Sequence, residues 1–241
     1  MRQTSKNDDD AVIARATADF VAMVSHQLKG PLGAVRAASV MLAAGDYGKL
    51  PARARETAVL MSHTTARLLA LIDTYLESTK LDLGSIAVRP KPTDLRKELG
   101  DLVALMAPLA KLKGLTIMQD VPEAFGRVTI DDDIFANVAF NLIDNAVAYT
   151  DQGSILVELE RVSDAVVLRV SDTGMGMKPS DAKTLFQRFQ RGVMGDDRRH
   201  KGTGLGLFLV KRLAEAAGGS VRAESRGPGK GSMFEVRLPV T

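Results

Sequence analysis

Apolar residues recur at helical spacing along two stretches of the first third of the chain. The first stretch starts at Ala11 and the second follows Pro51, and in both the apolar residues occupy positions a and d of consecutive heptads. A turn-forming sequence, Gly45-Asp46-Tyr47-Gly48, separates them. The pattern predicts a hairpin of two long helices over residues 11–82, after a polar, flexible lead-in over residues 1–10. The a and d residues are Val21, Val24, Leu28, Pro31, Val35, Ala38 and Leu42 in the first helix, and Met61, Thr64, Leu68, Leu71 and Tyr75 in the second.

One hairpin has no second layer against which to bury these apolar stripes. Pairing with a second copy into a four-helix bundle would bury them, so the pattern predicts a homodimer. With Val21 at position a, His26 falls at position f, which faces away from the seam. Most exposed histidines have no role, so the pattern alone assigns none to His26.

The periodicity changes after a linker-like stretch over residues 83–92. Helices are expected from Asp94, as N-cap, to about Lys111, over residues 131–148, and from Leu205 towards Gly218. Alternating segments predict strands between them. Residues 93–241 therefore form an α+β domain, which we expect to consist of helices on an antiparallel sheet. The expected strands cover residues 115–119, 154–162, 165–170, 220–223 and 233–238.

Composition narrows the class of protein. The chain has 241 residues, 45% of them apolar, which is enough for the core of one large domain or two smaller ones. A net charge of +3 with scattered basic residues argues against nucleic-acid binding. The absence of cysteine excludes disulfides and cysteine zinc sites. No apolar run is long enough to cross a bilayer, so we expect a cytoplasmic chain, by itself or as the cytoplasmic portion of a larger sensor.

Two glycine loops indicate a site for an anion. Gly202, Gly204 and Gly206 alternate with Thr203 and Leu205 where a helix is expected to begin, and a helix start offers free N–H groups to phosphate. Such a motif alone is often an ordinary turn. Here a second pair of glycines, at positions 174 and 176, follows Asp172 at the end of an expected strand. Neither the P-loop nor the Rossmann context is present, so another nucleotide-binding fold is needed.

Five segments resemble, in order, the sequence boxes of the sensor histidine kinases of two-component systems. The likeness covers roughly residues 15–240. It implies a helical hairpin for dimerisation and histidine phosphotransfer, paired into a dimeric four-helix bundle, followed over residues 93–241 by an α+β sandwich ATP-binding domain of the gyrase, heat-shock and histidine kinase type. The segments are S-H-Q-L-K-G-P-L (25–32), N-L-I-D-N-A-V-A-Y-T (141–150), D-T-G-M-G-M (172–177), L-F-Q-R-F-Q-R (185–191) and G-T-G-L-G-L (202–207).

The resemblance also implies a role for individual residues in binding Mg²⁺ and ATP. Asp172 matches the carboxylate that accepts a hydrogen bond from the adenine amino group, and Asn145 matches the Mg²⁺ ligand. Asn141 lies one helical turn before Asn145, where the related ATPases have a glutamate that activates water. Since asparagine cannot act as a base, transfer to a protein is favoured over hydrolysis. The remaining nucleotide-binding positions that the resemblance implies are Tyr149, Gly174, Gly176, Lys201, Gly202, Thr203, Gly204, Leu205 and Gly206.

His26 matches the phosphoacceptor of the family, and Arg191 matches a cation that approaches the γ-phosphate. A neutral imidazole has a free lone pair for in-line attack on phosphorus. Gln27 is expected to orient the ring. The phosphoryl group would then pass to an aspartate of a response regulator receiver domain, which must be a separate chain because none is found here.

Three residues depart from the family pattern. Gln27 replaces a usual acidic residue, Gly30 a usual Thr or Asn that positions water for dephosphorylation of the regulator, and Ala148 a frequent phosphate-contacting Lys. These departures leave open a non-catalytic or weakly active dimeric scaffold that binds nucleotide. An ATPase of the related superfamily is a third alternative, against which Asn141 argues.

Overall fold

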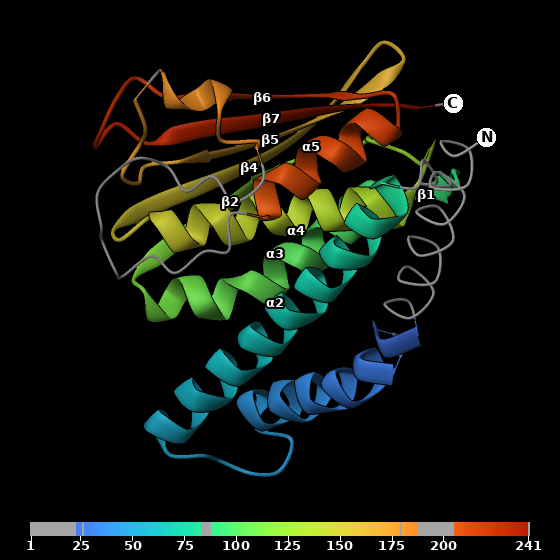
Figure 1. Cartoon of the computed structure of the whole chain (residues 1–241). Coiled ribbons are helices and arrows are strands. Elements are labelled where there is room, and N and C mark those ends of the chain that lie inside the picture. Colours follow the sequence, from blue (N-terminus) through green and yellow to red (C-terminus); the bar gives the residue numbers. More distant parts are fainter. Residues whose placement is uncertain (1–22, 26, 83–87, 179, 188–204, 241) are drawn as a thin grey trace, which may run out of the picture. The chain divides into compact units, whose positions relative to one another are not determined.

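The structure, a computed structural model of the chain, describes residues 23–25, 27–82, 88–178, 180–187 and 205–240 (Figure 1). The chain divides into two compact units, Met1–Ala87 and Val88–Thr241. The division falls inside the stretch expected to be a linker. Each unit is described by itself.

The first unit contains the expected helical hairpin. Residues 27–44 are helical, as are residues 23–25, and α2 spans Ala52–Asp82. Gly45 and Gly48 in the connecting turn have φ angles of +90° and +105°, which favour glycine. The Arg55 side chain donates from Nε to the carbonyl of Ala43 at 2.9 Å, which ties α2 to the end of the first helix.

The buried side chains of the hairpin are mostly small, and the large apolar side chains are exposed. The hydroxyl groups of Ser39 and Thr65 donate to carbonyls one turn earlier in their own helices, at 2.7 and 2.8 Å, so their burial leaves no donor unpaired. By contrast, the a and d residues Leu28, Val35 and Leu68 are 46%, 45% and 44% exposed. The described part of the hairpin therefore presents an apolar stripe that it does not bury. Buried residues of the hairpin are Ser25, Ser39, Ala58, Val59, Ser62, Thr65 and Ala66.

The second unit is a five-stranded sheet with helices on one face (Figure 1). The strand order is β2-β4-β5-β7-β6. The helices are α3 (Leu95–Leu112), α4 (Asp132–Tyr149) and α5 (Gly206–Ala216), with a short 3-10 helix at Asp181–Lys183. The five strands are β2 (Leu115–Asp120), β4 (Gly153–Val162), β5 (Ala165–Asp172), β6 (Ser220–Glu224) and β7 (Ser232–Pro239).

The expectation of an antiparallel sheet is wrong at one edge, where β2 and β4 are parallel. The reason is topological: α4 lies between these strands in the chain and forms a crossover connection, which returns the chain to the same end of the sheet. The other three strand pairs are antiparallel. A separate two-stranded ladder of β1 (Lys91–Thr93) and β3 (Val128–Ile130) was not expected from the sequence, because three residues carry too little periodicity.

The two faces of the sheet differ in character. The inner face contributes Ile155, Leu168 and Val236, which are at most 1% exposed, to the core beneath the helices. The outer face carries a charged row in which Arg169 donates to Glu235 at 2.6 Å and Arg222 pairs with Glu235 at 2.9 Å. Burial alone would raise the pKa of Glu235, but hydrogen bonds from the two arginines hold it below its usual value.

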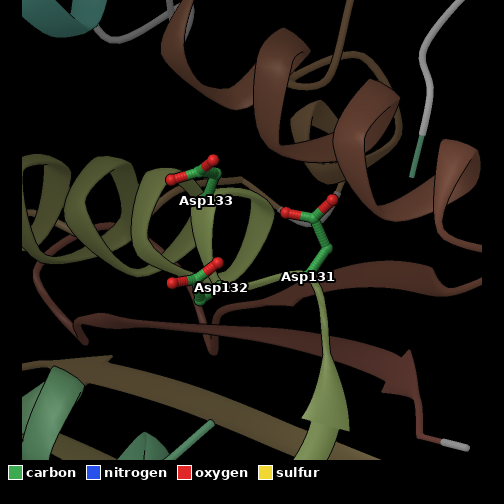
Figure 2. A group of neighbouring side chains, drawn as sticks. All are labelled: Asp131, Asp132 and Asp133. Atoms are coloured by element: carbon green, nitrogen blue, oxygen red, sulfur yellow. The ribbon is translucent and has the colours of Figure 1, made fainter. Parts of the chain in front are cut away.

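Three consecutive aspartates fix the start of α4 (Figure 2). Asp131 is the N-cap and accepts a hydrogen bond from the Ile134 N–H at 3.0 Å, while its other oxygen accepts from the Arg89 N–H at 2.7 Å. Asp132 pairs with Lys91 at 2.8 Å. These contacts attach the beginning of the second unit to α4. Oxygens of the three carboxylates lie within 4.8 Å of one another. The contacts to Arg89, Ile134 and Lys91 give Asp131 and Asp132 a structural role that needs no metal ion.

Candidate functional site

The first part of the site lies where α4 meets the start of α5. The Asn141 side chain donates from Nδ2 to the Asn137 carbonyl at 2.8 Å, which fixes the amide and leaves Oδ1 as an acceptor. A Cβ atom at Gly206 would lie 2.8 Å from that Oδ1, so glycine allows this approach without a shift of the Asn141 amide. Asn145, one turn further along α4, is half-buried. The N-terminus of α5 is thus placed beside Asn141.

The second part of the site is Asp172, the last residue of β5, which is 9% exposed. Its Oδ1 accepts hydrogen bonds from the Gly174 N–H at 2.8 Å and the Ser232 N–H at 3.3 Å. Burial raises the pKa of Asp172, and these two N–H groups oppose that shift only in part. Both of these N–H groups bind Oδ1, and among the described residues no donor to Oδ2 is seen.

The loop after Asp172 is held against the end of α4. The Met175 N–H donates to the Tyr149 carbonyl at 3.1 Å. A Cβ atom at Gly174 would collide with the same carbonyl, which explains why this position is glycine. Lys113 donates from Nζ to the Ala148 carbonyl at 3.2 Å and also contacts the Val147 carbonyl, so it caps α4. Burial lowers the pKa of Lys113.

A second loop, over residues 225–231, supports the first and was missed by the sequence analysis. The Ser225 hydroxyl accepts from the Met177 N–H at 3.1 Å and donates to the Gly231 carbonyl at 2.6 Å. In addition, the Gly231 N–H donates to the Gly174 carbonyl at 3.1 Å. The only signal in the sequence is the glycine-rich run S-R-G-P-G-K-G before the last strand.

Several predicted site residues lie outside the described residues. Among those that are described, Asn141 is brought next to Gly206, and Tyr149 next to Asp172 and Gly174. Gln27 is exposed on the first helix, and Leu205 precedes α5. Gly176 has a φ angle of +65° and is packed against Ser225, as a tight loop requires. Outside the described residues are His26, Arg191, Lys201, Gly202, Thr203 and Gly204.

Two protein-family models match the chain, each over a different part of it. Residues 16–84 match the His Kinase A (phospho-acceptor) domain, and residues 130–241 match the histidine kinase-, DNA gyrase B- and HSP90-like ATPases. None of the helices in the described ranges is long and apolar enough to cross a membrane.

Individual proteins similar to the chain include two bacterial relatives. An uncharacterized sensor-like histidine kinase of Rhizobium meliloti is 34% identical over 222 residues, which are 91% of this chain and 42% of that protein. The circadian input-output histidine kinase CikA of Synechococcus elongatus is 33% identical over 228 residues, 93% of this chain and 30% of that protein. The chain therefore spans less than half the length of these relatives.

Solved structures show the same fold. The full-length ShkA crystal structure in complex with AMPPNP has a TM-score of 0.66 and 27% identity, and the match covers 92% of this chain and 46% of ShkA. The Acinetobacter baumannii histidine kinase AdeS has a TM-score of 0.58 at 20% identity, over 90% of this chain and 98% of AdeS.

Proposed function

The chain belongs to the sensor histidine kinases of two-component systems, and on this premise we propose that it is the ATP-dependent kinase core that phosphorylates its own His26 and passes the phosphoryl group to an aspartate of a separate response regulator. The observation that best supports the proposal is the convergence of two distant segments, with Asp172 and Gly206, on the end and face of α4. Helix α4 itself supplies Asn141. The three segments match the boxes that the family uses for nucleotide.

Adenine is the base that Asp172 suits best. Because Oδ1 is engaged by two backbone N–H groups, Oδ2 is the acceptor for the 6-amino group of the purine. The start of α5 supplies N–H groups and a partial positive charge for the phosphates. The nucleotide therefore extends from Asp172 towards Gly206.

The residues on α4 also suit Mg²⁺. Amide oxygens are ligands that this ion accepts, and the Asn145 side chain is half-buried on the helix that carries the site. Asn141 keeps its Oδ1 free of protein donors among the described residues. Asn145 would hold the ion, which when bound offsets negative charge on the phosphates.

His26 is the proposed nucleophile. A ring nitrogen attacks the γ-phosphorus in line, the bond from that phosphorus to the β–γ bridging oxygen breaks, and ADP leaves. Arg191 is proposed to offset charge on the transferring group, and Gln27 to orient the imidazole. Asn141 provides no base for water, which favours transfer over hydrolysis. The alternative of a weakly active scaffold has no support among the relatives, which are named as kinases.

The hairpin over residues 11–82 is the proposed dimerisation and phosphotransfer domain, and residues 83–92 are its linker to the ATP-binding domain over residues 93–241. The exposed apolar stripe of the hairpin supports a homodimer in the form of a four-helix bundle. Histidine kinase A domains pair in this way, which is consistent with the match over residues 16–84.

Incubation with ATP that is labelled on its γ-phosphate tests the proposal. Incubation of the chain with γ-labelled ATP and Mg²⁺ should give a protein-bound label that is labile in acid and stable in base, because a phosphoramidate has this chemistry. His26→Ala should carry no label. His63→Ala, which removes another histidine of the same hairpin, should keep it. Label that survives in His26→Ala would refute the assignment.

A further inference from the structure

Thr150 ends α4 and carries a hydroxyl group that the fold leaves unpaired. The residue is fully buried, with 0% exposure. Its Oγ1 has no hydrogen-bond partner in the described part of the chain. Proteins rarely bury a hydroxyl without a partner, because the group loses water and gains nothing in return. The other buried hydroxyls named above, at Ser39 and Thr65, are paired, so the unpaired state of Thr150 needs a cause.

The position of Thr150 suggests that cause. A Cβ atom at Gly174 would lie 2.8 Å from Thr150 Oγ1 and 2.9 Å from Asp172 Oδ1. The two oxygens therefore lie close to the same point and are at most about two hydrogen-bond lengths apart, a gap that a rotation of the Thr150 side chain or a single water molecule can bridge. Asp172 is thus an acidic acceptor close to a donor that has no partner among the described residues.

Within the described ranges, Asp172 in turn has no charged donor. Its pKa is affected by burial and by the backbone N–H groups of Gly174 and Ser232, and no charged side chain of the described residues contributes. A buried carboxylate with few donors tends to take up a proton. An ionised carboxylate accepts from the 6-amino group of adenine, whereas a protonated one can donate to the 6-oxo group of hypoxanthine or guanine.

We propose that Thr150 is a positioning residue for purine selection, whose hydroxyl donates to Asp172, directly or through one water molecule, and keeps that carboxylate an acceptor for a 6-amino purine. The inference rests on the proposed binding of ATP. It assigns discrimination between amino and oxo purines to a pair of residues, of which only Asp172 contacts the base.

The test is the ratio of the affinities for ATP and inosine triphosphate, measured by calorimetry on the whole chain at one pH. Thr150→Val keeps the shape but removes the hydroxyl, and the ratio should fall about tenfold, the usual effect of a hydrogen bond to a charged group. Thr150→Ser should retain the wild-type ratio. In the Asp172→Asn background, Thr150→Val should change the ratio no further, because the effect passes through the carboxylate.

The outcomes separate the inference from the proposed function. An unchanged ratio in Thr150→Val, or an equal fall in Thr150→Ser, overturns the role of the hydroxyl while nucleotide binding stands. If the valine variant does not fold, Thr150→Ala replaces it with the same expectation. A wild-type chain that binds neither nucleotide refutes the proposed function, and the inference with it.

Discussion

At the scale of single residues, Asp172 shows the cost of burying a carboxylate, which we propose to bind adenine. The carboxyl is buried, its pKa is raised by that burial, and its two backbone donors compensate only in part. A folded-state pKa above the unfolded value means that folding favours the protonated form. The contribution of the group to stability is therefore present at low pH and is lost as the pH rises through the folded pKa.

Asp172→Asn should consequently separate stability from binding. The asparagine Oδ1 can accept the same two hydrogen bonds and carries no charge to desolvate, so the variant should melt at a higher temperature than the wild type at pH 7. The difference should shrink as the pH falls towards about 4, near the ordinary pKa of aspartate. ATP affinity should drop about tenfold or more, because the amide of a new side chain must reorganise to accept from adenine. Thermal unfolding at both pH values and calorimetry check this, and a variant with unchanged ATP affinity would contradict the role of Asp172.

At the scale of elements, the loop after β5, which we propose to bind nucleotide, is supported by the loop between β6 and β7. The Ser225 hydroxyl joins the two, with the Met177 N–H on one side and the Gly231 carbonyl on the other. Ser225→Ala should leave these groups without their partner and loosen the loop that carries Gly174 and Gly176. We expect ATP affinity to fall several-fold and stability by about 1–3 kcal/mol.

The matched control is Ser220→Ala, at an exposed serine that starts β6. It should change neither quantity by more than about 0.5 kcal/mol. A Ser225→Ala chain that loses stability but binds ATP as well as the wild type would show that the loop contact serves the fold alone.

The sequence predicted those features of the elements that depend on neighbouring residues, and not those that depend on distant ones. Helix α3 begins after Asp94, whose side chain accepts from the Lys97 N–H at 3.1 Å, as predicted, because capping is a local property of the chain. The edge strand β2 was predicted, but its parallel pairing with β4 was not, since strand pairing is set by distant segments. The same limit applies to Ser225 and Thr150, whose surroundings are formed by tertiary contacts and leave no local pattern. Asp172 and Gly206 could be proposed as site residues because their residue types recur in a family motif.

At the scale of the whole molecule, the apolar stripe of the hairpin predicts the assembly. Val35 and Leu68 are 45% and 44% exposed on helices whose buried positions are small residues. Leu68→Glu places a charge on this stripe and should raise the dissociation constant of the dimer at least about tenfold. At concentrations where the wild type is dimeric, the variant should therefore be mainly monomeric. Met118→Glu, at a residue 45% exposed on β2 of the other unit, is the matched control and should stay dimeric. Analytical ultracentrifugation distinguishes the two, and a dimer that survives Leu68→Glu would show that this stripe is not the interface.

The location of the phosphoryl group tests the central claim most directly. After the wild-type chain is incubated with Mg²⁺ and ATP at neutral to basic pH, mass spectrometry of its peptides should place one phosphate on His26 and none on His63 or His200. Phosphate on any other residue, or ATP turned over to free phosphate with no phosphorylated peptide, would contradict the account.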